Sequence, residues 1–193
     1  MDELPEFPVS VLESLRQPLE ERVVRVSRVG GTLTFPADFV LIACANTCPC
    51  GRAGDSCRCN DVQRARYARR LSAPLLDRFD IRLEVRKDAE RATESSADVA
   101  ARVAAAVDRQ RGRLGGTPWR RNAHIPAGAL ECLIPLATNV RAAWHGWCEV
   151  RDLTGRGAAR VRRVARTIAD LDDRADVVES DIDRALWARE DLW

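Results

Sequence analysis

Residues 39–50 read Phe-Val-Leu-Ile-Ala-Cys-Ala-Asn-Thr-Cys-Pro-Cys, an apolar run that ends at Asn46 and passes directly into a cysteine-rich loop. A near-continuous apolar run of this length is typical of a strand buried on both faces, as in a parallel sheet covered by helices. Open α/β sheets bind their ligands at the carboxyl ends of the strands. The stretch therefore predicts an α/β fold with Asn46 at a binding edge; an asparagine that only turns the chain is the plainer alternative.

The segments on either side of this run predict the rest of the first half. Ser10 and Glu13 have the spacing of a capping box, which predicts a helix that begins near Ser10. Two β-rich runs around Gly30-Gly31 predict a hairpin. After the cysteines we expect a helix from about Asn60 and a last strand over residues 81–85.

The second half of the sequence is typical of a helical domain. Residues 86–95 are charged and polar, as expected of a linker. Beyond them, apolar residues recur at helical spacing, most clearly at Val161, Val164 and Ile168. Ser180 with Asp183 predicts one more capped helix near the end of the chain.

Seven cysteines occur in a chain that shows no secretory signal, which favours reduced thiols or a metal over disulfides. Four of them form two Cys-x-Cys pairs, Cys48 with Cys50 and Cys57 with Cys59. Thiolates at this spacing can close a tetrahedral zinc site without distant ligands, and a reduced cysteine-rich loop is the alternative. The others stand among apolar neighbours and are expected to be small core residues: Cys44, Cys132 and Cys148.

The composition is that of an ordinary soluble protein, with 31 basic residues, 29 acidic residues and 46% hydrophobic residues. No apolar stretch is long enough to cross a membrane, so we expect no membrane association and a cytoplasmic location. Lys87 is the only lysine, and no glycine lies near it. The sequence therefore contains no phosphate-binding loop of the form Gly-x-x-x-x-Gly-Lys-[Ser/Thr].

Arginine runs are the remaining feature of the charge pattern. They occur at residues 64–70, at Arg25 and Arg28, and at Arg120-Arg121. Each run could contact the phosphates of DNA. A solvated face is the plainer alternative for each run taken separately.

Four motifs follow one another in a characteristic order. They are Asp-Glu-Leu-Pro-Glu-Phe at residues 2–7, Asn-Thr-Cys-Pro-Cys-Gly at 46–51, Leu-Ser-Ala-Pro-Leu-Leu-Asp-Arg-Phe-Asp at 71–80 and Arg-Val-Ala-Arg-Thr-Ile-Ala-Asp-Leu at 163–171. In this order they resemble the magnesium-chelatase-like AAA+ ATPases, most of all the competence-associated ComM/YifB branch. The resemblance implies the C-terminal part of an α/β AAA+ core, with an incomplete parallel sheet, over residues 1–86. It also implies an all-helical lid domain over residues 97–193.

The resemblance further implies roles for individual residues. Asp2 and Glu3 match the end of a Walker B strand, where Asp2 would hold Mg²⁺ and Glu3 would orient the attacking water. Asn46 matches sensor 1, which lies near the γ-phosphate of ATP. Arg78 matches the arginine finger that reaches the nucleotide of the next subunit, although pairing with a neighbouring aspartate is the plainer alternative. Arg156 matches the sensor 2 arginine at the start of a lid helix.

Partners follow from the same resemblance. Intact relatives form rings that hydrolyse ATP between subunits, and the competence branch is associated with DNA remodelling in recombination. The resemblance thus implies ATP, Mg²⁺, a homo-oligomeric ring and DNA, with the chain inactive alone because it lacks the phosphate-binding loop. Three alternatives stay open: half of a split ATPase, a zinc-stabilised DNA-binding or interaction module, and a pseudogene product or misplaced start codon.

Overall fold

The computed structural model describes residues 1–52, 56–85 and 94–189. Within these ranges the chain forms two compact units, Met1–Phe79 and Asp80–Asp191. The fold is mixed, with a two-stranded sheet in the first unit and helices in both units. No helix in the described ranges combines the length and the apolar content that a bilayer crossing requires.

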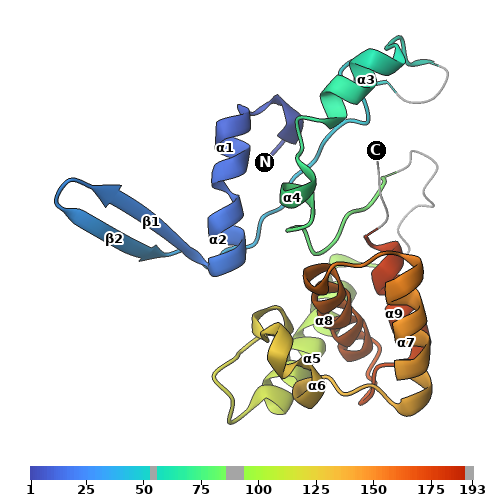
Figure 1. The fold of residues 1–193 in the computed structure, drawn as a ribbon. Helices are drawn as coiled ribbons and strands as arrows, with labels where there is room; N and C mark the ends of the chain where they lie inside the picture. The colour runs from blue at the N-terminus through green and yellow to red at the C-terminus, as the bar shows by residue number, and fades with distance from the viewer. Residues whose placement is uncertain (53–55, 86–93, 190–193) are drawn as a thin grey trace. The chain divides into compact units, whose positions relative to one another are not determined.

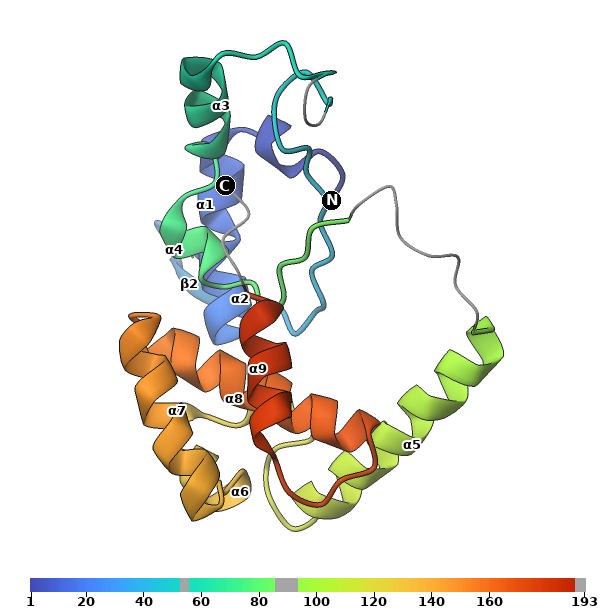
Figure 2. The same cartoon turned by 90° about the vertical axis from the view of Figure 1, so that its right-hand side faces the viewer.

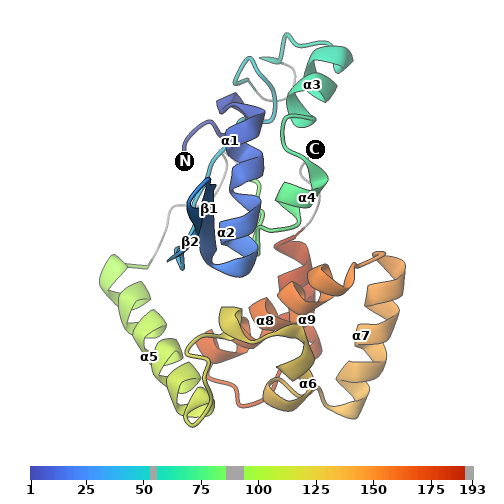
Figure 3. The same cartoon turned by 60° about the vertical axis from the view of Figure 1, so that its left-hand side comes forward.

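Short helices build the core of the first unit. After the 3₁₀ turn η1 (Leu4–Glu6), α1 (Val9–Ser14) and α2 (Arg16–Glu21) follow one another along nearly the same line (Figure 3). They pack against α4 (Ala73–Leu76), and the contact buries Leu12 and Leu75 completely. Apolar burial between segments distant in sequence thus holds this unit together.

The predicted helix near Ser10 is confirmed, but its predicted cap is wrong. The helix begins at Val9 after Pro8, and no side chain caps it. Glu13 instead accepts a hydrogen bond from the Ser72 hydroxyl (2.6 Å), just before α4. The Glu13 carboxylate thus joins α1 to the residue before α4 instead of capping its own helix.

The predicted hairpin is confirmed. Strands β1 (Val23–Arg28) and β2 (Gly31–Pro36) pair antiparallel, with Val23 opposite Pro36 and Arg28 opposite Gly31, and extend from the end of α2 (Figure 1). Gly31 has φ +133°, a backbone conformation that side-chain-bearing residues rarely adopt, which explains the glycine at this turn.

The prediction that residues 39–45 form a buried strand is wrong. The segment is extended but is not part of the sheet, and Val40 and Ile42 are 75% and 78% exposed. Only its end is paired: the Met1 amine donates to the Ile42 carbonyl (2.7 Å), and the Cys44 amide donates to the Met1 carbonyl (3.0 Å). These two bonds flank Met1 as in a parallel ladder. The Leu4 amide also donates to the Cys44 carbonyl (2.9 Å), and among the described residues these three bonds are all that forms of the expected parallel sheet.

Two other predictions for this region have opposite outcomes. The helix predicted from Asn60 is confirmed as α3 (Asp61–Ala68), in which the side chains of Asn60 and Gln63 cap each other's backbone amides. The strand predicted over residues 81–85 is wrong, because these residues are irregular and Ile81 and Val85 are largely exposed.

Helices of the second unit pack around α8 and α9. Its elements are α5 (Ser96–Leu114), η3 (Asn122–His124), η4 (Ala127–Ala129), α6 (Leu130–Leu133), α7 (Thr138–Val150), α8 (Gly155–Leu171) and α9 (Glu179–Trp187). Helices α5 and α7 lie on opposite sides of the α8–α9 pair (Figures 2 and 3). Small buried residues, Ala165 and Ala169 on α8 and Ala185 on α9, allow the helices to approach closely.

The predicted start of the last helix is wrong by one residue, and its capping pair is wrong by two. Helix α9 begins at Glu179, and the Asp181 carboxylate accepts from the Val178 amide (3.0 Å). Asp181 is completely buried and also pairs with Arg174. The buried ion pair therefore selects which acid caps the helix.

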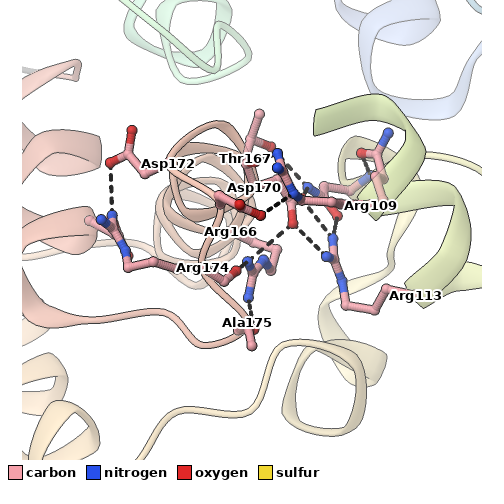
Figure 4. A network of polar contacts seen from close by, with 12 residues as sticks. Arg109, Arg113, Arg166, Thr167, Asp170, Asp172, Arg174 and Ala175 are labelled. Atoms are coloured by element: carbon pink, nitrogen blue, oxygen red, sulfur yellow. Dashed lines mark hydrogen bonds and ion pairs between the residues drawn. The ribbon is translucent and has the colours of Figure 1, made fainter. Parts of the chain in front are cut away.

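Asp170, near the end of α8, is the centre of a buried polar network (Figure 4). It is 2% exposed and accepts hydrogen bonds from Arg113 on α5 (2.5 and 2.8 Å) and from the side-chain amide of Asn122 (2.9 Å). Arg166, one turn earlier on α8, lies 3.1 Å from the same carboxylate. A buried carboxylate needs such compensation because desolvation of an unpaired charge is costly.

We expect Asp170→Asn to destabilise the chain by about 3 kcal/mol or more, because the buried Arg166 and the partly buried Arg113 would lose their counter-charge. Asp173→Asn is the matched control. Asp173 is 76% exposed and pairs with Arg109, and exposed pairs contribute about 0–1 kcal/mol. Urea unfolding of both variants measures the difference, and equal losses of stability would contradict the central role of Asp170.

Candidate functional site

Asp2 lies against the segment that ends at Asn46. Its Oδ1 atom accepts a hydrogen bond from the Cys44 thiol (2.8 Å) and another from the Glu3 amide (2.9 Å). These bonds hold the pKa of the Asp2 carboxyl below its usual value, with the Cys44 bond the larger cause. The same contact raises the pKa of Cys44, which is exposed, so the prediction that Cys44 is a core residue is wrong.

Glu3 and Asn46 lie just beyond the contact between Asp2 and Cys44 in the sequence. Glu3 is exposed and has φ +48°, a left-handed conformation that turns the chain directly after Asp2. Asn46 is exposed, two residues beyond Cys44. Met1 and Leu4 both pair with residues 42–44, so Asp2 lies within this contact and Asn46 follows it by two residues. Open α/β sheets bind their ligands at the carboxyl ends of the strands, and the place of these residues in such a site stays a prediction.

The Asn46 side chain also faces the cysteine-rich loop. A Cβ atom added to Gly51 would lie 3.8 Å from its amide nitrogen. Gly51 has φ +69°, so the loop turns back on itself at a position that favours glycine. The loop that carries the cysteines therefore also borders the candidate nucleotide residue.

Arg78 is held within its own unit. Its guanidinium donates to the carbonyls of Pro74 (2.6 Å) and Arg16 (3.2 Å) and lies 3.4 Å from the Glu20 carboxylate. The side chain is 10% exposed. The guanidinium of Arg78 is thus paired with an acid on α2, Glu20.

Arg156 belongs to the second unit. It is exposed in the first turn of α8, where the Thr154 hydroxyl accepts from the Gly157 amide (3.0 Å) and caps the helix. The predicted position at the start of a helix is therefore confirmed, whereas its role as sensor 2 stays a prediction.

The four clustered cysteines converge on one point. Their sulfur atoms all lie within 4.8 Å of one another. The Cys48 sulfur is 3.2 Å from that of Cys50 and 3.4 Å from that of Cys57, and Cys50 and Cys57 are 3.7 Å apart. A zinc ion with four sulfurs at about 2.3 Å in a tetrahedron would separate them by roughly 3.8 Å. The donor set and its spacing therefore fit zinc.

The thiols differ in acidity. Backbone hydrogen bonds, above all one involving Arg58, lower the pKa of Cys50 to about 6. Desolvation raises the pKa of Cys59 to about 11, and the hydrogen bond with Cys50 raises that of Cys48. Crowded sulfurs of this kind resist full ionisation unless a cation balances their charge.

Sequence reasoning did not identify Arg64 as a neighbour of this cluster. Its guanidinium, on the first turn of α3, donates to the Cys59 carbonyl (2.8 Å) and lies 3.8 Å from the Cys57 sulfur. The capped helix start directly after Cys59 was the available signal, because it fixes residue 64 one turn beyond the loop.

Comparison with known proteins places the chain in a family. Residues 1–93 match the family described as "Magnesium chelatase, subunit ChlI", and residues 93–189 match "Magnesium chelatase, subunit ChlI C-terminal". The chain belongs to this magnesium-chelatase-like family. Its two halves match two successive family segments, so the resemblance recognised in the motifs is confirmed.

Individual relatives narrow the branch. YifB of Escherichia coli is 34% identical over 186 residues, which are 92% of this chain and 36% of YifB. Mb2921c of Mycobacterium bovis is 34% identical over 204 residues, 98% of this chain and 39% of that protein. Competence protein ComM of Haemophilus influenzae is 48% identical over 86 residues, 44% of this chain and 17% of ComM. The chain thus spans about two fifths or less of the length of these relatives.

We expect Asp2→Ala to speed alkylation of Cys44 at pH 8. Loss of the carboxylate lowers the pKa of Cys44 toward its ordinary value, so a larger fraction is thiolate at that pH. Cys132, which is also exposed, is the control and should react at an unchanged rate. Mass spectrometry of iodoacetamide-treated protein measures both rates. An unchanged Cys44 rate would contradict the Asp2–Cys44 contact.

Proposed function

We propose that the chain is the C-terminal part of a magnesium-chelatase-like AAA+ ATPase that hydrolyses ATP at subunit interfaces and remodels DNA in recombination or competence. The observation that carries the ATP-linked part is the contact between Asp2 and Cys44, next to the parallel pairing of Met1. It brings an acid pair and an asparagine to one edge, which supports a site for a metal-bound phosphate. Family membership and the similarity to competence protein ComM of Haemophilus influenzae support the DNA-linked part.

Each residue in this proposal has a chemical task. ATP with Mg²⁺ would supply the phosphoryl group that water attacks. Asp2 would ligate the metal, and Glu3 would orient the water. Asn46 would donate its amide hydrogens to the water or the γ-phosphate, and Arg156 would bind the nucleotide from the lid. These are tasks of positioning and charge neutralisation, which dominate phosphoryl transfer.

The phosphate-binding loop must come from another stretch of polypeptide. Lys87, the single lysine, has no such loop around it. The 193 residues would therefore supply the water-orienting acids, the sensors and the arginine finger, but not the phosphate cradle. A ring of subunits, or a partner that carries the loop, completes the site in this proposal.

Arg78 would have to change partners to act as an arginine finger. In the chain by itself its guanidinium is paired with Glu20 and two carbonyls. The phosphates of a nucleotide bound to a neighbouring subunit carry more negative charge than one carboxylate, so they can compete with Glu20 for the guanidinium of Arg78. The proposal therefore links subunit assembly to the release of Arg78 from α2.

The test uses the 193-residue chain alone and joined to a polypeptide region that carries a Gly-x-x-x-x-Gly-Lys-[Ser/Thr] loop. We expect no ATP turnover from the chain alone and measurable turnover from the fusion. Arg78→Ala should lower turnover of the fusion about 10³-fold. Arg141→Ala, an exposed arginine on α7, is the control and should leave it unchanged. Turnover by the chain alone, or equal rates in the two variants, would overturn the proposal.

Zinc binding is a second proposed property, carried by the convergence of the four sulfurs. Because the loop also borders Asn46 at Gly51, a bound ion would hold both the loop and the edge of the candidate nucleotide site. It would act as a structural site, closed by four protein ligands with no open position for substrate.

We expect about one zinc per chain in protein purified without chelator, and loss of most of it in Cys48→Ser, because three remaining thiolates bind a structural zinc poorly. Cys132→Ser removes an exposed thiol outside the cluster and should retain the metal. Elemental analysis by plasma mass spectrometry measures both. Metal-free wild-type protein that stays metal-free after refolding with zinc would rule the site out.

A further inference from the structure

A groove lies at the end of α5 in the helical unit. It has a volume of about 680 Å³ and is formed between the last turns of α5 and the segment over residues 115–121. Leu114 and the half-buried Trp119 supply apolar surface, and Arg111, Arg120 and Arg121 supply charge. The groove thus combines an aromatic ring with several guanidinium groups.

The charge of this region is one-sided. Between residues 109 and 130 the sequence has arginine at 109, 111, 113, 120 and 121 and neither aspartate nor glutamate. Arg109 and Arg113 are engaged by Asp173 and Asp170. Arg120 and Arg121 are exposed and have no acidic partner among the described residues. Two cations therefore remain available to an anionic ligand.

The wall that carries these cations is anchored rather than loose. The Asn122 amide donates to the Gln110 side chain on α5 (2.6 Å), and the Asn122 side chain donates to the buried Asp170 (2.9 Å). Thr117 bonds the backbone of Leu114 and Trp119, which fixes the turn before the tryptophan. Trp119 also packs against the core of the helical unit. A preorganised wall loses little entropy on binding.

We propose that this groove binds single-stranded nucleic acid, with Trp119 stacking on a base and Arg120 and Arg121 contacting backbone phosphates. An aromatic ring beside exposed cations is the combination by which proteins hold unpaired strands. Bases of a duplex are stacked on one another and offer no face to Trp119. The proposal rests on the DNA-linked part of the proposed function, and assigns it a surface that needs neither ATP nor the phosphate-binding loop.

Fluorescence anisotropy of a labelled oligo-dT, titrated with the full chain without nucleotide, tests the site. Arg120→Ala/Arg121→Ala should weaken binding about tenfold or more. The slope of log K against log[salt] should also become shallower by about 1.4, because two phosphate contacts are lost.

Arg66→Ala/Arg69→Ala is the first control and removes the same charge from two exposed arginines at α3. Because Arg66 and Arg69 belong to a run that could itself contact phosphates, Arg141→Ala/Arg184→Ala is the second control. It removes the same charge from exposed arginines of α7 and α9 and should change affinity by less than about twofold.

Trp119 is tested separately. Trp119→Phe keeps a stacking ring and should bind within about threefold of wild type, whereas Trp119→Leu keeps apolar bulk and should bind about fivefold or more weakly. Circular dichroism checks that both variants fold. If Trp119→Leu unfolds, the contribution of Trp119 is measured instead from the quenching of tryptophan fluorescence by the oligonucleotide, in wild type compared with Trp119→Phe.

The outcomes separate the alternatives. Equal losses in Arg120→Ala/Arg121→Ala and in Arg141→Ala/Arg184→Ala would show non-specific attraction and overturn the groove as the site. Competition by free ATP at concentrations equal to the oligonucleotide would assign the groove to a nucleotide instead. Binding without any ATP turnover in the fusion would retain this site while the ATPase proposal fails, and the reverse result would retain the ATPase and overturn the groove.

Discussion

The carboxylate of Asp170 is the constraint on which the helical unit depends. It is buried at the end of α8, where an uncompensated charge would be too costly to retain. Its partners come from α5, from the segment that carries Asn122 and from α8 itself. Since these segments are far apart in sequence, the charge is neutralised only when all are in place. One buried acid thus fixes the helix packing and one wall of the basic groove.

Local signals predicted elements well and their exact caps poorly. The Gly-Gly hairpin and the helix after Asn60 formed as expected, because their turn and cap interactions lie within a few residues. Glu13 and Asp181 departed from expectation because each carboxylate is used in a contact with a distant segment. The burial predicted for residues 39–45 was wrong, because an apolar run is buried only where other strands and helices cover it, and among the described residues its backbone partners are Met1 and Leu4 alone.

Much of the candidate site could be read from spacing, and the rest required three-dimensional neighbours. Two Cys-x-Cys pairs in one short loop already imply four convergent sulfurs. The contact of Asp2 with Cys44 spans most of the first unit and has no sequence signal of its own. The pairing of Arg78 with Glu20 is equally non-local. Family motifs located these residues, and only the fold shows which groups hold them.

Residues 39–45 form an extended segment outside the two-stranded sheet, and its backbone edge is bordered by the exposed side chains of Val40 and Ile42. Within the described ranges their backbone partners are Met1 and Leu4 alone. Such an edge accepts a further strand by backbone pairing, and the pairing would bury Val40 and Ile42 at the same time. Strand addition here would also fix Asn46, which directly follows. The added strand would then determine the position of Asn46, so the ordering of residues 39–46 and the binding of a partner strand would occur together.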